Sequence, residues 1–289
     1  MDGVLPREHT GGKMKTIEEE VVRHWSHGSL QEAIRRGLIA AGHSLDGLKP
    51  DDLAPVDEFH MGGRGATVHL TEKIDLKPGI SVLDIGSGIG GPARFLASHY
   101  GCSVVGIDLT PEYVAVAESL TNMVGLAGQV TFSVGSATAL PFDAGSFDAA
   151  LLMHVAMNIS DKERLCAEVA RVLRVGGMFG VYEVMQTSDG DLAYPVPWAE
   201  TATLSFLGAP SDFRQALAAA GFTVVAEEDR REFALDFFRQ MRARMIESGP
   251  PPLGIHIHMG PTAPEKIANM IENMERGLIA PIEMICQRG

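Results

Sequence analysis

The sequence predicts an α/β fold built on a doubly wound, mostly parallel sheet, and three observations predict it. Short buried apolar runs alternate with stretches of helical periodicity from residue 80 to about residue 186. Such alternation at short spacing specifies parallel strands joined by right-handed crossovers. A glycine-rich loop follows the first apolar run, and helical apolar spacing fills residues 16–41 before it.

The elements are predicted in order along the chain. Residues 1–15 are predicted to form a flexible tail, and residues 47–65, rich in Pro, Asp and Gly, a connector. The predicted strands are 81–85, 103–107, 130–134, 149–153, 178–185, 222–226 and 279–286. The predicted helices of the same region are 92–100, 111–124, 161–172, 211–220, 229–248 and 264–276.

Two proline-containing segments interrupt the strand–helix rhythm near residues 186–210 and 248–262. We interpret them as insertions over the strand ends. The predicted organisation is therefore a helical N-terminal cap over residues 16–70 and a core over residues 71–289 that carries these two cap insertions.

The charge balance and the cysteines exclude several classes of function. In 289 residues there are 24 Lys and Arg against 37 Asp and Glu, a net charge of −13. A chain this acidic repels a phosphate backbone and an anionic membrane surface, so neither is an expected partner. The three cysteines are far apart without a CxxC, which argues against a zinc knuckle or a disulfide framework. The polar N-terminus lacks a signal-peptide core, and the prediction is a cytoplasmic protein of open oligomeric state.

The glycine-rich loop is the first candidate binding motif. The run Val82-Leu-Asp-Ile-Gly-Ser-Gly-Ile-Gly-Gly91 follows a predicted strand and opens a helix. Its spacing satisfies GxGxxG, the pattern of a dinucleotide site. Two features argue against a dinucleotide: the Asp84 carboxylate would face the pyrophosphate, and about 80 residues precede the loop. A plain strand–helix turn is the remaining alternative.

S-adenosylmethionine meets both objections. It carries an ammonium and a sulfonium, which a nearby carboxylate attracts, and it has no phosphate. Glycines let the backbone approach such a ligand closely. Asp108 ends the second predicted strand, 18 residues after Gly90 (108 − 90), and a carboxylate there can accept hydrogen bonds from both ribose hydroxyls.

These residues resemble the class I S-adenosylmethionine-dependent methyltransferases. The resemblance rests on VLDIGSGIGG, VVGIDLT at 104–110, VGSATALPFDAGSFD at 134–148 and ARVLRVGGMFGVYE at 170–183. It implies a seven-stranded sheet with an antiparallel last strand, S-adenosylmethionine as cofactor and S-adenosylhomocysteine as product. Residues 57–67 and 154–159 are further similar to segments of the sarcosine/dimethylglycine methyltransferase-like group, in which the first segment lies over the cofactor.

The resemblance implies a set of cofactor-binding residues along the strand ends. They are Asp84, Gly86, Ser87, Gly88, Gly90, Asp108, Leu109, Ser136, Ala137, Met153 and His154. Ser136 departs from the family, because many relatives have Asp there beside the adenine. A hydroxyl therefore replaces a carboxylate near the adenine amino group.

Methyl transfer to an acceptor that loses a proton calls for a general base, and histidine suits neutral pH. The candidate catalytic residues are His154 and His60; a packed core histidine is the alternative for His154. The predicted substrate pocket contains Phe59, His60, Tyr182, Trp198, His256 and His258. No third ligand accompanies His256 and His258, so no metal is expected.

The predicted function is methylation of a small molecule, with an amine nitrogen as the leading acceptor. O- or C-methylation of an aromatic or quinone-like acceptor is the alternative within this class. From other classes, an NAD-dependent oxidoreductase and a non-catalytic S-adenosylmethionine-binding protein stay open, since glycine motifs report binding and not turnover.

Overall fold

The computed structural model describes residues 17–26 and 28–289 in full and the backbone of residues 10–16. Its centre is a seven-stranded sheet of order β3-β2-β1-β4-β5-β7-β6. The strands are β1 (Ser81–Ile85), β2 (Ser103–Asp108), β3 (Val130–Val134), β4 (Phe147–Met153), β5 (Leu173–Gln186), β6 (Phe222–Asp229) and β7 (Ile279–Arg288). β7 lies between β5 and β6 and pairs antiparallel with both, while the first five strands are parallel. The predicted fold class is confirmed.

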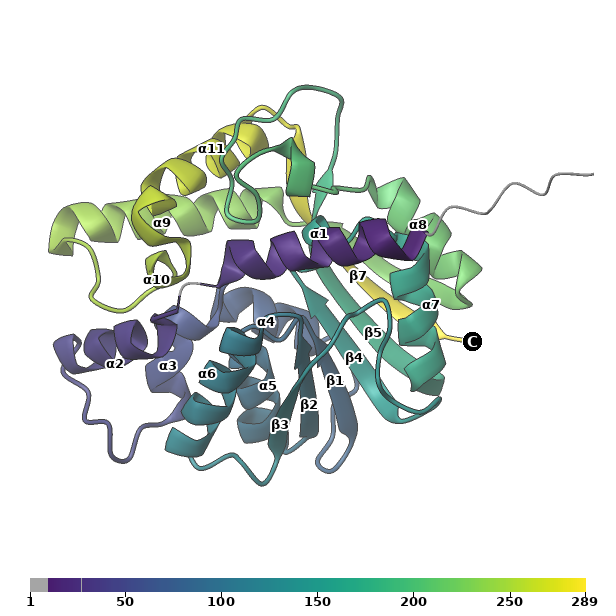
Figure 1. Cartoon of the computed structure of the whole chain (residues 1–289), viewed down its shortest axis with the longest axis horizontal. Coiled ribbons are helices and arrows are strands. Elements are labelled where there is room, and N and C mark those ends of the chain that lie inside the picture. Colours follow the sequence, from purple (N-terminus) through teal and green to yellow (C-terminus); the bar gives the residue numbers. More distant parts are fainter. Residues whose placement is uncertain (1–9, 27) are drawn as a thin grey trace, which may run out of the picture.

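Helices cover both faces of this sheet (Figure 1). One face packs against α4 (Arg64–Thr71), α5 (Gly91–Phe95) and α6 (Pro111–Met123), and the other against α7 (Lys162–Val172) and α8 (Pro210–Ala219). A π-helical turn, Leu96–Tyr100, continues α5. Because apolar side chains meet both faces, the parallel strands β1 and β4 are buried along most of their length.

The remaining helices build a cap over the carboxyl ends of the parallel strands. They are α1 (Thr10–Trp25), α2 (Leu30–Ala40), α3 (Pro50–Asp57), α9 (Arg231–Ser248), α10 (His256–Met259) and α11 (Ala263–Glu275). The buried faces of α9 and α11 pack around Trp198 and Val196 of the first insertion. The cap therefore also includes α9 and α11, which the sequence analysis had placed in the core.

Several predicted boundaries were wrong. α1 begins at Thr10, within the predicted tail, whose residues 1–9 lie outside the described residues. The predicted connector 47–65 contains α3 and the start of α4. Pro50 at the first helical position and the Asp52 carboxylate, which accepts from the Lys49 N–H at 2.8 Å, start α3. None of the described helices is both long and apolar enough to cross a membrane.

Candidate functional site

The candidate site is a pair of adjoining cavities between the carboxyl ends of the strands and the cap. The larger cavity, about 170 Å³, is lined by the loops that follow β1 to β4 and by α1. The smaller, about 40 Å³, is lined by side chains of the cap and of the loop after β4. Trp25, Phe59, His60 and His154 line both cavities and form the throat between them.

Asp84 brings a carboxylate to the start of the glycine loop. The residue is 2% exposed, and its Oδ2 has no hydrogen-bond partner among the described residues. Burial, and then the Glu58 and Asp108 carboxylates, raise the pKa of Asp84 to about 7. A buried carboxylate oxygen without a partner is costly, and a cationic group in the cavity would satisfy it.

Three loop glycines have different local roles. A Cβ on Gly86 would lie 2.3 Å from the Val155 side chain, so the close packing of the loop on the β4 turn requires glycine. Gly88 has a φ of +54°, and a Cβ there would meet nothing within 4 Å, so its open side faces cavity space. Gly90 precedes α5 and packs against Phe132; it does not line either cavity.

Asp108 lies at the end of β2, beside β1. Its Oδ2 accepts from the Gly88 N–H at 2.9 Å and its Oδ1 from the Thr110 N–H at 2.8 Å. Burial raises the pKa of Asp108, and these backbone donors lower it in part. The Thr110 hydroxyl and the Leu109 N–H also donate to this carboxylate, which lines the cavity where a ligand diol would compete with them.

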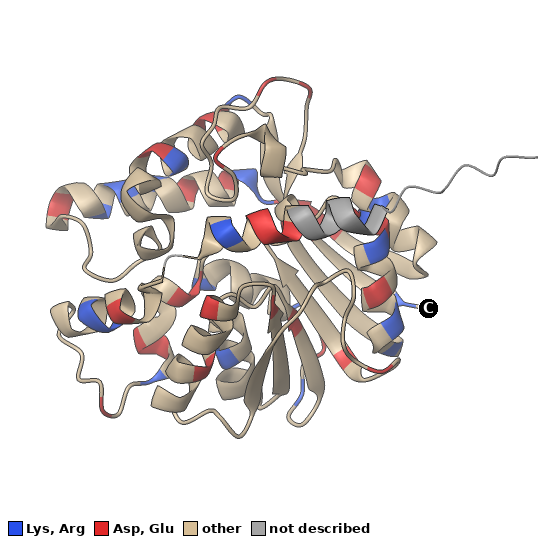
Figure 2. Ribbon diagram, in the orientation of Figure 1, with Lys and Arg blue, Asp and Glu red and all other residues tan. Residues whose placement is uncertain are grey.

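The end of β3 and α1 complete the larger cavity. Leu109, Ser136 and Ala137 line it. The Ser136 hydroxyl donates to Glu18 Oε1 at 2.6 Å, and Glu18 belongs to α1, which carries acidic residues (red in Figure 2) across this side of the molecule. Glu18 was not among the predicted site residues, because nothing in the sequence of α1 indicates a partner 118 residues away.

The smaller cavity is apolar apart from the two throat histidines. Its other lining residues are methionines, aromatics, isoleucines and one proline: Trp25, Phe59, Met61, Met157, Pro197, Trp198, Phe238, Ile255, Met259, Ile267 and Met270. No carboxylate or cationic side chain is among the described lining residues. Such a lining accommodates an apolar molecule and excludes water from its neighbourhood.

His154 is held in place by both ring nitrogens. It has a φ of 56°, and its Nδ1 lies 3.0 Å from the Tyr182 carbonyl oxygen, which assigns the hydrogen to Nδ1. The Met61 N–H then donates to Nε2 at 3.4 Å. Burial, and then the charge of His60, lower the pKa of His154 to about 3. These contacts favour a packed positioning residue over a general base.

All the polar contacts of the His60 ring with the described residues are made by one nitrogen, Nε2. Its Nε2 lies 3.1 Å from the Gly63 carbonyl oxygen, 3.0 Å from Thr67 Oγ1 and 3.4 Å from Glu58 Oε2. The carbonyl assigns the hydrogen to Nε2 and leaves Nδ1 as a lone-pair nitrogen. Burial lowers the pKa of His60, while the Glu58 carboxylate raises it. A neutral imidazole beside a buried carboxylate can accept a proton.

The other predicted pocket residues are divided. Trp198 lines the smaller cavity and His258 the larger one; the His258 ring stacks on that of Phe59, which lines both, with centroids 4.8 Å apart. Met153 lines the larger cavity. His256 is exposed and Tyr182 donates its hydroxyl to the Met61 carbonyl at 3.0 Å; neither lines a cavity. α10 is helical, so His256 and His258 do not share a face as they would on a strand.

Buried polar residues that the sequence analysis missed join the cap to the core. Arg94 of α5 is 0% exposed and donates to Asp57 of α3 at 2.6 Å. Asn158 donates to the carbonyl oxygens of Trp198 at 2.8 Å and Leu204 at 2.9 Å, and so holds the first insertion against the β4 loop. The sequence offered one indication of this pair: Arg94 places a charged residue at a position where the helical pattern expects an apolar one.

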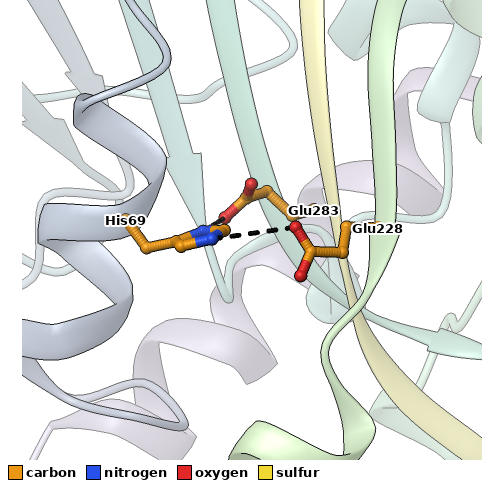
Figure 3. Close-up of side chains that lie close together, drawn as sticks. All are labelled: His69, Glu228 and Glu283. Atoms are coloured by element: carbon orange, nitrogen blue, oxygen red, sulfur yellow. Dashed lines mark hydrogen bonds and ion pairs between the residues drawn. The ribbon is translucent and has the colours of Figure 1, made fainter.

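A separate cluster of titratable side chains lies between α4 and the far strands (Figure 3). His69, Glu228 and Glu283 bring three ligand-type atoms within 4.8 Å of one another. Lys73 contacts both carboxylates, and Arg230 contacts His69 and Glu228. Because these two cations already occupy the acceptor atoms, we assign the cluster to an ion-pair network that anchors α4 on β6 and β7.

Comparison with known proteins identifies the domain. Residues 83–181 match a family model described as a methyltransferase domain. The sterol 24-C-methyltransferase of Eremothecium gossypii is 27% identical over 258 residues, which are 76% of this chain and 66% of that protein. Squalene methyltransferase 2 of Botryococcus braunii is 40% identical over 116 residues, 40% of this chain and 31% of that protein. The matches thus span about a third to two thirds of these relatives.

Solved structures share the fold. A geranyl diphosphate C-methyltransferase from Streptomyces coelicolor superposes with a TM-score of 0.70 at 17% identity, covering 98% of this chain and 100% of that one. A structure described as a sarcosine dimethylglycine methyltransferase from Galdieria sulphuraria gives a TM-score of 0.65 at 20% identity, covering 78% and 85%. At these identities the likeness concerns the fold, which is the Rossmann-like fold predicted.

Proposed function

We propose that this chain, which carries a class I S-adenosylmethionine-dependent methyltransferase domain, transfers a methyl group to a small, largely apolar acceptor. The observation that carries the proposal is the pair of cavities that meet at one throat. One cavity has carboxylates at the ends of adjacent strands, and the other is apolar. A charged cofactor and an uncharged acceptor would meet where Phe59, His60 and His154 lie.

The residues of the larger cavity fit S-adenosylmethionine. The unpartnered Asp84 Oδ2 suits its ammonium, and the open side of Gly88 admits its methionine end. Asp108 lines the cavity where it would accept from the ribose hydroxyls, and the segment after β3 would lie beside the base. A pyrophosphate fits poorly, since it would meet the Asp84 and Asp108 carboxylates, which speaks against the NAD alternative.

S-adenosylmethionine, when bound, supplies an electrophilic methyl on a sulfonium and leaves as S-adenosylhomocysteine. An acceptor's electron pair would displace the sulfur at that methyl carbon, and the electrons of the broken carbon–sulfur bond would stay on the departing sulfur. The chain's part is to align the two along one line and to exclude water. The aromatic rings of Trp25 and Phe59 lie at the throat, where positive charge would pass from sulfur to acceptor.

His60 is the group we assign to proton removal. Carbon or oxygen acceptors lose a proton during or after methylation, and the lone-pair Nδ1 of His60 can accept it. Glu58 lies 3.4 Å from the opposite ring nitrogen and would stabilise the imidazolium. His154 packs beside it, with ring centroids 6.1 Å apart, and holds the throat in shape.

The apolar lining supports a hydrophobic acceptor over a small charged amine. An ammonium in the smaller cavity would meet methionines and aromatic rings and no carboxylate. The curated relatives quoted above are named for methylating sterols and squalene. About 40 Å³ of free space holds roughly three waters. A large acceptor would therefore insert only its reacting end unless the cap moves.

The experiment is transfer of a labelled methyl group to three sets of acceptors: apolar alkenes, phenols and quinols, and small amines such as sarcosine. We expect label in an alkene or phenol product. Methylation of the amines alone would overturn the apolar assignment and restore the amine hypothesis. Calorimetry with S-adenosylhomocysteine and with NAD tests the identity of the cofactor independently of the acceptor. Binding of NAD alone would overturn the methyltransferase proposal.

A further inference from the structure

The ends of β1 and β2 each bring a carboxylate to the larger cavity, but the loop after β3 brings a hydroxyl instead. Going outward along the sheet from β1 to β2 to β3, the strand ends carry Asp84, then Asp108, then the Ser136 hydroxyl. If Asp84 holds the ammonium and Asp108 the ribose, the purine extends to Ser136. This inference rests on the proposed function. A purine with a 6-amino group presents hydrogen-bond donors there, and an acceptor is needed.

α1 supplies a carboxylate to that place from outside the strand pattern. Glu18 lines the larger cavity, and its Oε1 accepts the Ser136 hydroxyl at 2.6 Å. Ser136 is itself fixed, since Thr138 contacts its hydroxyl through both its own hydroxyl, at 2.9 Å, and its N–H, at 3.2 Å. Glu18 Oε2 makes no hydrogen bond with the described residues, so it can accept from a ligand.

We propose that Glu18 accepts a hydrogen bond from the 6-amino group of the bound adenine, replacing the carboxylate that Ser136 does not provide. Ser136 becomes the side chain that orients Glu18. The carboxylate favours a 6-amino purine over a 6-oxo purine, whose carbonyl would face it with like partial charge.

The same helix links the adenine to the acceptor. Trp25, at the end of α1, lines both cavities, and its Nε1 donates to Asn158 Oδ1 at 3.3 Å. His24 Nε2 lies 3.1 Å from the Pro197 carbonyl oxygen of the first insertion. Docking of α1 on an adenine through Glu18 therefore also completes the wall of the smaller cavity. α1 thus contributes to both the adenine end of the larger cavity and the wall of the smaller one.

A four-way binding cycle tests the proposal. Calorimetry on the full chain measures S-adenosylhomocysteine and its analogue without the 6-amino group, on wild type and Glu18→Ala. Wild type is expected to bind the amino form about tenfold tighter, the worth of one charge-assisted hydrogen bond. Glu18→Ala is expected to discriminate less than about twofold. The matched control is Glu20→Ala, two residues along α1 and exposed, which should keep the wild-type ratio.

A rescue variant separates the specific contact from general damage to α1. Glu18→Ala combined with Ser136→Asp returns a carboxylate to the end of β3, and it should restore discrimination for the 6-amino group. Wild-type discrimination in Glu18→Ala would overturn the role of Glu18. Tight binding of S-adenosylhomocysteine by wild type would leave the proposed function standing in that case. Wild type that binds neither ligand would overturn the proposed function and this inference together.

Discussion

The two cavities of the site are built in opposite ways. Most of the larger cavity comes from one stretch of chain, residues 84–161, in which each strand ends in a loop that faces the same edge of the sheet. The smaller cavity takes its lining from segments as distant as Trp25 and Met270. The first is rich in backbone and carboxylates, the second in methionine and aromatic side chains.

This difference follows from what each cavity has to recognise. A cofactor of constant shape is recognised by close backbone approach and fixed charges, which a strand–loop–helix unit provides locally. An apolar acceptor is recognised by the shape of a side-chain surface, which any group of packed helices can provide. The adaptable methionines of the smaller cavity suit such a surface.

The largest effect should come from breaking the buried ion pair that joins the cap helix α3 to the core helix α5. Arg94→Met removes the partner of Asp57 inside a fully buried pair and leaves that carboxylate uncompensated. We expect a loss of about 3–5 kcal/mol in the free energy of unfolding. Arg239→Met, at the exposed pair with Asp236, is the control and should cost at most about 1 kcal/mol. Chemical denaturation measures the free energy of unfolding of both variants. Equal losses would contradict a special role of the buried Arg94–Asp57 pair.

His60→Gln tests the throat. Glutamine keeps a donor for the Gly63 carbonyl but cannot act as a base. If His60 accepts the proton, kcat should fall about 100-fold or more while the Kd for S-adenosylhomocysteine stays within about threefold. Steady-state kinetics on the accepted substrate and calorimetry provide the two readouts. A kcat near that of the wild type would remove His60 from the chemistry.

Asp84→Asn tests the polar cavity. Loss of the carboxylate should weaken S-adenosylhomocysteine binding about 10- to 100-fold, because a charge-assisted contact to the ammonium is lost. The fold should be retained, since Asp84 Oδ2 has no partner to lose among the described residues. Calorimetry gives the Kd, with circular dichroism as the folding control. An unchanged Kd would exclude Asp84 from the site.

The pH dependence of the stability of the unliganded protein should also depend on the Asp84 carboxylate. Burial raises the pKa of Asp84 from its ordinary value of 3.8 to about 7, so between these values the native state binds more protons than the unfolded state. The contribution of Asp84 to stability is therefore favourable at low pH and is lost as pH rises toward 7. Asp84→Asn should flatten this slope in urea titrations from pH 4 to 8, although Asp57 and Glu183, with raised pKa values of about 6 and 7, keep part of it.

The smallest effect should come from the apolar cavity. Phe238→Leu changes the wall of the smaller cavity without touching the strand loops. We expect a several-fold change in the acceptor KM, about 1 kcal/mol, with the cofactor Kd unchanged. Phe179→Leu, equally buried but within the sheet core, controls for lost packing. Weaker cofactor binding in Phe238→Leu alone would show that the two cavities are not separable.

How far the site could be predicted from the sequence follows the same division. Asp84, Gly86, Gly88, Asp108 and the segment after β3, predicted to bind the cofactor, all line the larger cavity, because strand ends meet at one edge of a parallel sheet. His256 was not, since its segment forms a helix that turns the side chain to solvent. The helices α3 and α4 were hidden in a segment whose prolines and glycines are typical of a loop.

The sequence by itself determined the sheet and the cofactor side, since periodicity, glycine spacing and strand-end carboxylates are local patterns that act through the backbone. Only the tertiary structure decided which side chains meet across the cap. Glu18 reaches Ser136, Arg94 reaches Asp57 and Asn158 reaches Trp198 over long sequence separations. Apolar packing has no direction, so many arrangements of cap helices satisfy the same hydrophobic pattern. The fold selects the one that also satisfies these buried polar groups.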